Sequence, residues 1–333
     1  MEVEKRIKAF SELGKALKTS DIIQSAAAEC VIKNPWFIKE NVEYSINALA
    51  DNLTESNLRE WAKKYNTEPV ATKTIAVIMA GNIPLVGFHD FLCVLISGHR
   101  IVCKLSSNDN VLLPAIAKVL ASIDNEFERL INFAESRISD FDAVIATGSN
   151  NTSRYFDYYF GKYPHIIRHN RNSIGILSGN ENAQELEALC DDIFLHFGLG
   201  CRSVNKIYVP RNYNFDNLIA AAKKYEYLFD HHIYKSNLDY HKALLLLNNV
   251  AFIDGGFWML KEDTSMYSPV SIINFEYYDK ITEVTTFIEN NTENIQCVVA
   301  KDITNAIAFG NAQKPTLTDY ADGVDTMEWL ASI

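Results

Sequence analysis

Positive charge is scarce in this sequence and is nowhere concentrated. The chain contains 31 lysines and arginines against 42 aspartates and glutamates, which gives a formal net charge of -11 at pH 7. Nucleic acids and anionic membranes are bound by clustered cations, so the composition argues against either as a dedicated partner. A single anionic ligand is not excluded, because a few local cations and backbone N–H groups suffice for one phosphate.

Long hydrophobic segments are also missing. No run of about 18 apolar residues is available to span a bilayer. Residues 1–20 are charged and helical in pattern, without the apolar stretch and cleavage site of a secretory signal. We therefore expect a cytoplasmic protein with no membrane span.

The six cysteines lack the paired short spacings of disulfide frameworks and zinc sites. They are predicted to be free thiols: Cys30, Cys93, Cys103, Cys190, Cys201 and Cys297. The adjacent His231 and His232 would point apart on a helix or a strand, so we expect no bound metal.

Short apolar runs alternate with amphipathic segments in most of the chain. After helical patterns in residues 1–66, the sequence predicts strands at 74–79, 101–105, 143–146 and 165–168, with helices at 84–97, 112–122 and 152–160. A second series predicts strands at 174–177, 207–209, 270–275 and 296–300, with helices at 181–197, 217–228 and 281–289. Strand–helix alternation with short connections predicts an α/β protein with two doubly wound lobes and an N-terminal helical segment.

Cys201 is the first candidate for chemistry. It follows Gly198-Leu199-Gly200, at the predicted end of the helix over 181–197, and precedes the strand at 207–209. The two glycines leave room for a substrate carbonyl to approach the sulfur. A thiol at such a junction is well placed for nucleophilic attack, although most single cysteines are small buried apolar side chains.

Polar residues also follow three strands of the first series. They are Gly81-Asn82-Ile83-Pro84, Lys104 with Ser106 and Ser107, and Thr147-Gly148-Ser149-Asn150. In doubly wound sheets, ligands bind at the carboxyl ends of strands, where helix N-termini supply N–H groups. Together these residues predict a phosphate or nucleotide cradle. Ser106 and Asn150 could equally cap helices, and the G-x-G-x-x-G fingerprint is absent.

These segments occur in an order that resembles the aldehyde dehydrogenase superfamily, and the chain is most similar to the LuxC-type acyl-CoA reductases. The resemblance runs from about Thr74 to the C-terminus. It rests on Gly81–Asp90, Ser97–Ser107, Ala146–Ser149, Arg168–Ser173, Gly198–Cys201, Ser268–Val270 and Asp319–Asp325. It implies an aldehyde-dehydrogenase-like fold: N-terminal helices plus a Rossmann-like nucleotide-binding domain over 1–172, a catalytic domain over 173–310, and a tail over 311–333 that packs back on the body.

The resemblance also implies roles for individual residues. Cys201 would be the acyl-accepting nucleophile, and the Asn82 side-chain amide would stabilise the oxyanion together with the Cys201 N–H. For the coenzyme, the implied contacts are Lys104 and Ser106 at the adenosine ribose or its 2′-phosphate, and Thr147, Gly148 and Ser149 at the pyrophosphate.

The chain departs from the hydrolytic dehydrogenases at two places. Where they carry a general-base glutamate it has Arg168–Arg171, and where they carry a ribose-binding glutamate it has Ser265. Without a base to activate water, an acyl-enzyme would persist until hydride arrives, which favours thioester reduction. His169 is a candidate acid/base, with a structural histidine as the other interpretation.

The sequence thus predicts reduction of a long-chain acyl-CoA or acyl-carrier-protein thioester to the aldehyde, with NADPH as coenzyme and NADH as the alternative. We expect a homo-oligomer and an acyl-activating enzyme as a partner. Two alternatives stay open. One is an acyl-phosphate or semialdehyde-type reductase of the same fold, for which Arg202 is the evident cation near Cys201. The other is a non-catalytic partner subunit that retains the fold.

Overall fold

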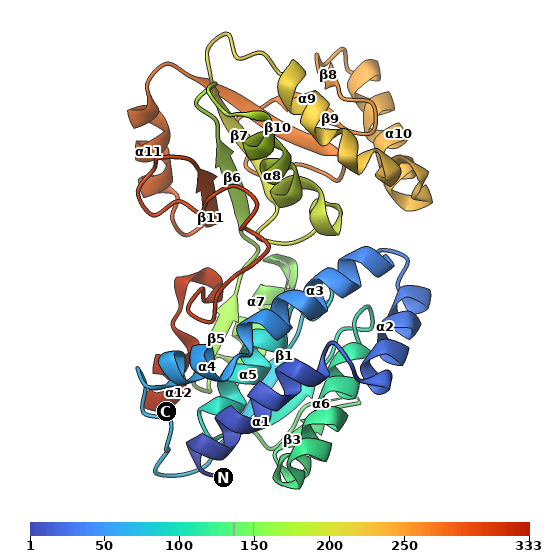
Figure 1. Cartoon of the computed structure of the whole chain (residues 1–333). Coiled ribbons are helices and arrows are strands. Elements are labelled where there is room, and N and C mark those ends of the chain that lie inside the picture. The colour runs from blue at the N-terminus through green and yellow to red at the C-terminus, as the bar shows by residue number, and fades with distance from the viewer. Residues whose placement is uncertain (136, 149) are drawn as a thin grey trace. The chain divides into compact units, whose positions relative to one another are not determined.

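The computed structural model describes residues 1–135, 137–148 and 150–333. The chain forms two compact units: unit 1 contains Met1–Asn170 and Thr316–Ile333, and unit 2 contains Arg171–Pro315. The sequence placed the first boundary after residue 172 and the start of the tail at residue 311. Each unit contains a mainly parallel sheet with helices, as predicted, and Figure 1 labels their elements.

Unit 1 is built on a five-stranded parallel sheet in the order β3-β2-β1-β4-β5. Its strands are β1 (Thr74–Ile78), β2 (Arg100–Lys104), β3 (Ile131–Phe133), β4 (Ala143–Thr147) and β5 (His165–Arg168). The connecting helices are α5 (Phe88–Ile96), α6 (Leu112–Ile123) and α7 (Asn150–Phe160). Because parallel strands end at the same edge, the segments that follow β1, β2 and β4 lie along one edge of this sheet.

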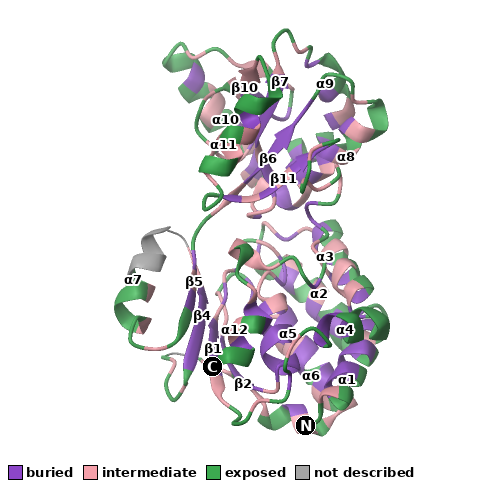
Figure 2. Ribbon diagram, turned by 90° about the vertical axis from the view of Figure 1, so that its left-hand side faces the viewer, coloured by how far each residue is buried: buried purple, intermediate pink, exposed green. Residues whose placement is uncertain are grey.

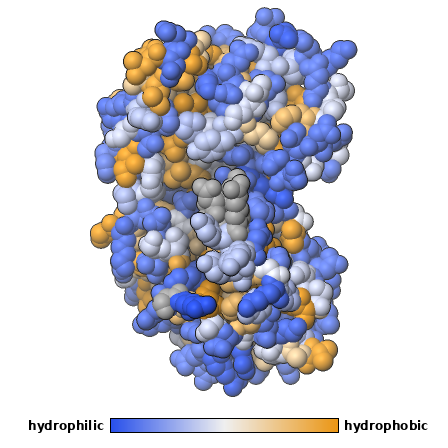
Figure 3. All heavy atoms as spheres, turned by 180° about the vertical axis from the view of Figure 1, so that it is seen from behind, coloured by the Kyte–Doolittle hydropathy of each residue, from blue (hydrophilic) through white to orange (hydrophobic). Residues whose placement is uncertain are grey.

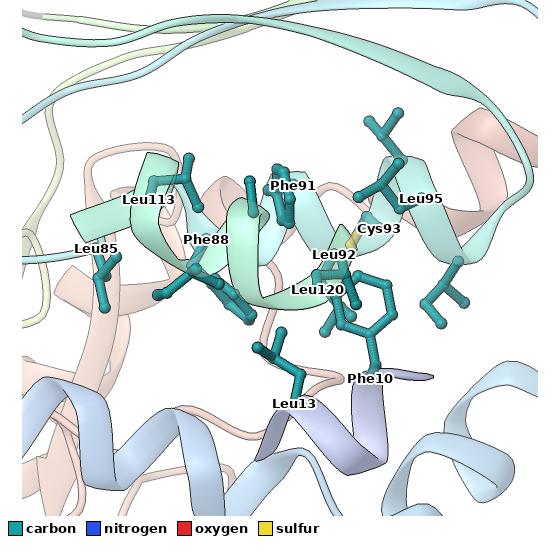
Figure 4. Packing of buried hydrophobic residues seen from close by; sticks show 14 of the residues in the cluster. Phe10, Leu13, Leu85, Phe88, Phe91, Leu92, Cys93, Leu95, Leu113 and Leu120 are labelled. Carbon is teal, nitrogen blue, oxygen red and sulfur yellow. The ribbon is translucent and has the colours of Figure 1, made fainter. Parts of the chain in front are cut away.

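Four N-terminal helices cover α5 and α6 in two steps: the first packs on both, the second packs on α6, and the third and fourth pack on the first. They are α1 (Val3–Ala16), α2 (Asp21–Lys33), α3 (Lys39–Asn52) and α4 (Glu55–Ala62). Figure 4 shows Phe10 and Leu13 of α1 directed toward Phe88 and Phe91 of α5. The rings of Phe10 and Phe91 pack edge to face, with their centroids 6.4 Å apart. These side chains are almost fully buried, so the N-terminal segment belongs to the hydrophobic core of unit 1.

Helix α5 corrects the prediction of a helix over 84–97. It begins at Phe88, after a turn that contains Pro84. Leu85 has a φ of 60°, which is outside the right-handed helical region. Its N–H donates to the buried Asp109 carboxylate at 2.7 Å. The right-handed helix can therefore begin only after Leu85, and the bond to Asp109 holds the turn that precedes it.

Unit 2 is built on a six-stranded sheet in the order β11-β6-β7-β10-β9-β8. Its strands are β6 (Asn172–Ile176), β7 (Val204–Pro210), β8 (Ile253–Asp254), β9 (Met259–Glu262), β10 (Ile272–Tyr278) and β11 (Ile295–Ala300). All neighbouring pairs are parallel except β8 with β9. Its helices are α8 (Ala183–Phe194), α9 (Asp216–Ala222), α10 (His232–Leu247) and α11 (Ile281–Asn290).

Helix α8 is shorter than the predicted helix over 181–197. It ends at Phe194, and the next residues form a short 3-10 turn, Leu195–Gly198. His196 and Phe197 have φ values of 54° and 58°, which a right-handed helix cannot contain. The chain therefore winds in the left-handed sense before Cys201.

The strands of the two sheets contain many of the buried residues. In Figure 2 most strand residues are buried, and the exposed residues lie mainly on the outer faces of helices. The face of the molecule in Figure 3 is mostly hydrophilic, with apolar residues in small groups. Among the residues that the structure describes, no helix is both long and apolar enough to cross a membrane.

A buried ion pair joins distant parts of unit 1. The Arg168 guanidinium at the end of β5 donates to both carboxylate oxygens of Asp90 on α5, at 2.5 and 2.7 Å. It also donates to Thr326 Oγ1 of the C-terminal helix α12 (Thr326–Ser332) at 3.0 Å. Arg168 and Asp90 are 5% and 3% exposed, so removal of either leaves the other charge without its partner in the interior.

We predict that Asp90→Ala lowers the free energy of unfolding by about 3–5 kcal/mol, because Arg168 stays buried without its counter-charge. Denaturant unfolding measures this loss. Asp279→Ala is the matched control, since it removes a two-bond arginine pair with Arg211 that is more than half exposed. Its loss should be much smaller, because exposed ion pairs contribute little to stability. Equal losses in the two variants would contradict a special role for the buried pair.

Candidate functional site

Cys201 lies in the turn between the 3-10 segment at Leu195–Gly198 and β7. It is partly exposed, whereas the other five cysteines are buried. Burial thus distinguishes Cys201 from the remaining thiols. It is the cysteine that a reagent or a substrate reaches most readily.

The backbone ahead of Cys201 is held in an uncommon conformation. His196, Phe197 and Gly198 all have positive φ, of 54°, 58° and 72°, and each non-glycine residue in this region costs roughly 1–2 kcal/mol. The Phe197 ring compensates by packing on His231, with ring centroids 4.6 Å apart. A Cβ on Gly198 would lie 3.3 Å from the Ile193 carbonyl oxygen. The turn that presents the thiol is thus tightly packed.

The backbone around and after Cys201 is fixed by hydrogen bonds. Its carbonyl oxygen accepts a bond from Ser173 Oγ at 2.9 Å. Ser203 Oγ accepts the Gly200 N–H at 3.2 Å, and the Ser203 N–H donates to the Gly200 carbonyl at 3.0 Å. Arg202 Nε donates to the Ala312 carbonyl at 2.5 Å. These bonds limit the movement of the thiol, as a nucleophile requires.

Asn82 lies on the loop between β1 and α5 in unit 1, and its side chain is exposed. Two contacts fix this loop. A Cβ on Gly81 would lie 2.6 Å from Ser106 Oγ, so a side chain does not fit there, and the Leu85 N–H is bound by Asp109. Burial raises the pKa of Asp109 to about 6. Asp109 was not predicted as part of the site, because nothing in its local sequence indicates this contact.

Lys104 and Ser106 lie at the carboxyl end of β2, as predicted. The Lys104 ammonium group donates to the carbonyls of Glu135 at 2.9 Å and Ala134 at 3.5 Å, just after β3. Ser106 Oγ accepts the Asn108 N–H at 3.2 Å, so the serine also shapes a turn. Both side chains therefore have structural partners at the position predicted for the coenzyme.

Thr147 is the last residue of β4, and Gly148 follows it. Thr147 pairs with Arg168 in the sheet, and Ile78 of β1 pairs with Lys104. The predicted Ser149 lies outside the described residues. The structure thus brings Lys104, Thr147, Gly148 and the loop of Asn82 to the same edge of the sheet in unit 1.

His169 follows β5 and is exposed. Its backbone N–H donates to the Asp322 carboxylate at 3.2 Å. The preceding Arg168 is buried and bound to Asp90. The segment Arg168–Arg171 contains no carboxylate, and the nearby Asp322, which comes from the C-terminal segment, was missed by sequence reasoning.

Ser265 belongs to a loop that is held by buried polar residues of unit 2. Ser265 Oγ donates to the Tyr267 carbonyl at 3.0 Å. The fully buried Lys206 donates to the Thr264 carbonyl at 2.8 Å and to Glu276 at 2.6 Å. Asn274 Nδ2 donates to the Ser265 carbonyl at 3.0 Å. No local motif indicates this support, because Lys206 simply precedes the apolar residues 207–209 of β7. No group of three or more potential metal ligands occurs among the described residues.

The sequence matches a family model. Residues 34–222 match the model described as acyl-CoA reductase (LuxC), which is more than half of the chain. That stretch contains Asn82, Lys104, His169 and Cys201. No curated protein compared with the sequence matches it.

The fold is similar to those of solved aldehyde dehydrogenases. Aldehyde dehydrogenase 21 from Physcomitrella patens aligns with a TM-score of 0.65 at 13% identity, over 92% of this chain and 74% of that one. An NAD-dependent benzaldehyde dehydrogenase from Corynebacterium glutamicum gives 0.65 at 14% identity, over 91% and 77%. An NADP-dependent glyceraldehyde-3-phosphate dehydrogenase from Bacillus halodurans, complexed with NADP, gives 0.63 at 13%, over 94% and 77%. The predicted aldehyde-dehydrogenase-like fold is confirmed.

We predict that iodoacetamide labels Cys201 of the native protein at least about tenfold faster than any other cysteine, because reactivity requires an accessible thiolate. Burial raises the pKa of Cys30 to about 12 and also raises those of Cys93, Cys103 and Cys190. Peptide mass spectrometry gives the six rates. In urea the rates should converge, and faster native labelling at a buried cysteine would contradict the assignment.

Proposed function

The chain belongs to the LuxC acyl-CoA reductase family, and from this membership we propose that it reduces an acyl thioester to the aldehyde through an acyl-enzyme on Cys201. It is an oxidoreductase with the aldehyde dehydrogenase fold. The observation that carries the proposal is the partly exposed Cys201 thiol, held in a packed turn while the other cysteines are buried. A nucleophile needs this combination of access and fixed position.

The chemistry begins at Cys201. Its thiolate attacks the thioester carbonyl, a new C–S bond forms, and collapse of the oxyanion expels the thiol of coenzyme A or of an acyl carrier protein. The Asn82 side-chain amide and the Cys201 N–H are the proposed oxyanion donors. A nicotinamide coenzyme would supply the hydride that reduces the acyl group. Cys201 then carries the oxyanion of a thiohemiacetal, and collapse of this oxyanion breaks the C–S bond, releases the aldehyde and regenerates the thiolate.

The carboxyl edge of the sheet in unit 1 fits a nicotinamide coenzyme. Lys104 supplies a cation there, and the segments that follow β1, β2 and β4 lie along this edge. The similar dehydrogenases include an NAD-dependent enzyme and one complexed with NADP. We propose NADPH, because the Lys104 ammonium would attract the additional 2′-phosphate.

Arg202 is relevant to the choice between a thioester and an acyl phosphate as the substrate. Such a substrate would need cations close to Cys201, and the Nε of Arg202 is bound to the Ala312 carbonyl. That bond uses one of the five guanidinium N–H donors, so Arg202 keeps its charge. Arg202 is the evident cation near Cys201 in the sequence, whereas a phosphate would need several, and we therefore keep a thioester as the proposed substrate.

We predict that a long-chain acyl-CoA, added without coenzyme, leaves a thioester on Cys201 that intact-protein and peptide mass spectrometry detect. The adduct should persist, because Arg168–Arg171 supplies no carboxylate to activate water. NADPH should then discharge it as aldehyde. Cys201→Ser is the control and should show no adduct. Rapid loss as free acid would indicate a hydrolytic enzyme, and the absence of any adduct would refute the acyl-enzyme.

We predict that Asn82→Ala lowers kcat by about 10²–10³, the usual effect of removing one oxyanion donor, with a much smaller change in KM. Steady-state aldehyde formation measures both constants. Asn47→Ala, on the exposed side of α3, makes the same substitution away from the site and should leave both unchanged. If only KM moves in Asn82→Ala, Asn82 is a turn residue and the assignment fails.

A further inference from the structure

A carboxylate without solvent exposure lies near the end of α8. Asp192 is 0% exposed, and its two oxygens accept the Gly310 N–H at 2.6 Å and the Ala312 N–H at 2.8 Å. Burial raises its pKa to about 7, although both hydrogen bonds oppose the rise. The bound segment, residues 310–313, is called the strap below. Gly310 has a φ of 83°, and a Cβ there would lie 3.0 Å from the Ala188 side chain, so the strap packs closely on α8.

The strap also contacts the turn that contains Cys201. The Ala312 carbonyl accepts the Arg202 Nε–H at 2.5 Å. Gln313 Nε2 donates to Ser203 Oγ at 3.1 Å, and the same oxygen accepts the Gly200 N–H. The strap therefore joins Asp192 to Arg202 and Ser203, which follow the nucleophile, and Ser203 in turn binds Gly200 before it. These contacts connect segments more than 100 residues apart in the sequence, and all lie within unit 2.

We propose that Asp192 is a positioning residue for Cys201 that acts through the strap, and that its ionised form is the one that holds the thiol in place. The inference deepens the proposed function and rests on Cys201 as its nucleophile. An ionised carboxylate accepts both N–H groups. A protonated one carries a hydrogen on one oxygen, so that one buried N–H loses its acceptor and the strap has to shift.

The other charged groups near Asp192 do not explain a pH-dependent change in its contact with the strap. The neighbouring Asp191 on the same helix is bound by Lys224 and by the Tyr225 hydroxyl, both at 2.6 Å. Arg202 is the cation that faces Asp192 from the turn, and it stays charged at neutral pH. The strap itself presents backbone N–H groups to the carboxylate. Asp192 is thus the group whose protonation changes the contact.

The test compares alkylation of Cys201 by iodoacetamide in the wild-type protein and in Asp192→Asn, from about pH 6 to about pH 8.5, with Cys201 read by peptide mass spectrometry. The asparagine resembles the protonated acid at every pH. At high pH the two rates should differ by about tenfold, because a shifted strap changes the exposure and the surroundings of the thiol. At about pH 6 the two rates should converge. A nearby charge shifts the ionisation of a thiol, so each rate is divided by the thiolate fraction of the same protein, read from its own pH profile.

Two further variants make the result decisive. Gln313→Leu breaks the contact between the strap and Ser203 without altering the carboxylate, and it should change the alkylation rate by a similar factor at every pH. Asp191→Asn, on the neighbouring position of α8, should leave the rate at about pH 8.5 unchanged, because Asp192 is ionised there with or without the charge of Asp191. Thermal unfolding of each variant shows whether it is folded.

A ratio near one at all pH values, or a constant ratio for Asp192→Asn, would overturn the proposal. If Asp192→Asn fails to fold, an unchanged rate in Gln313→Leu overturns it instead. Iodoacetamide needs neither acyl-CoA nor coenzyme, so these outcomes are independent of whether the protein reduces thioesters. If Asp192→Asn shows the expected pH-dependent ratio of alkylation rates but acyl-CoA leaves no thioester on Cys201, only the proposed function is refuted.

Discussion

A charge in an apolar interior has to be matched by hydrogen bonds or counter-charges, and this constraint fixes the loops that surround the candidate site residues. Asp109 holds the backbone of the loop that contains Asn82. The Asp90–Arg168 pair fixes the end of β5, where His169 follows. Asp192 holds the strap behind Cys201, and Lys206 holds the loop of Ser265. Most of these partners are backbone groups, so a displaced loop would leave a buried charge unpaired. The interior thus determines the conformation of segments that have little apolar surface of their own.

The elements that sequence analysis predicted well are those with strong local signals. Buried parallel strands are continuous apolar runs, which is why β1, β2, β4 and β5 were placed within a residue or two. Glycine-containing segments after the strands correctly indicated the carboxyl edge of the sheet. The partly exposed Cys201 also agrees with its sequence context, because glycines on both sides of Leu199 keep bulky side chains away from the sulfur. The resemblance to acyl-CoA reductases added the residue roles, which no periodicity could provide.

The errors arose where distant contacts override local preference. The predicted helices over 84–97 and 181–197 were wrong at the ends nearest the site, because Leu85, His196 and Phe197 adopt positive φ. That conformation depends on Asp109 in one case and on the packing of Phe197 against α10 in the other. Helix α10 itself was not predicted. It has apolar residues on its exposed side as well as its buried side, so the periodicity of a single amphipathic face is weak.

The correct predictions and the errors have the same physical explanation. Residues that perform chemistry are recognised by type and local spacing, because a thiol or an amide has to be where a substrate can reach it. Residues that hold them are ordinary aspartates and lysines whose importance comes from burial, which sequence alone does not reveal. A carboxylate that accepts two backbone N–H groups about 120 positions away, as Asp192 does, leaves no motif. The strained turn ahead of Cys201 persists because such contacts, together with the packing of Phe197, offset the unfavourable φ values. The position of the Cys201 thiol therefore depends on the folded interior of unit 2 and not only on the glycine-containing segment before it.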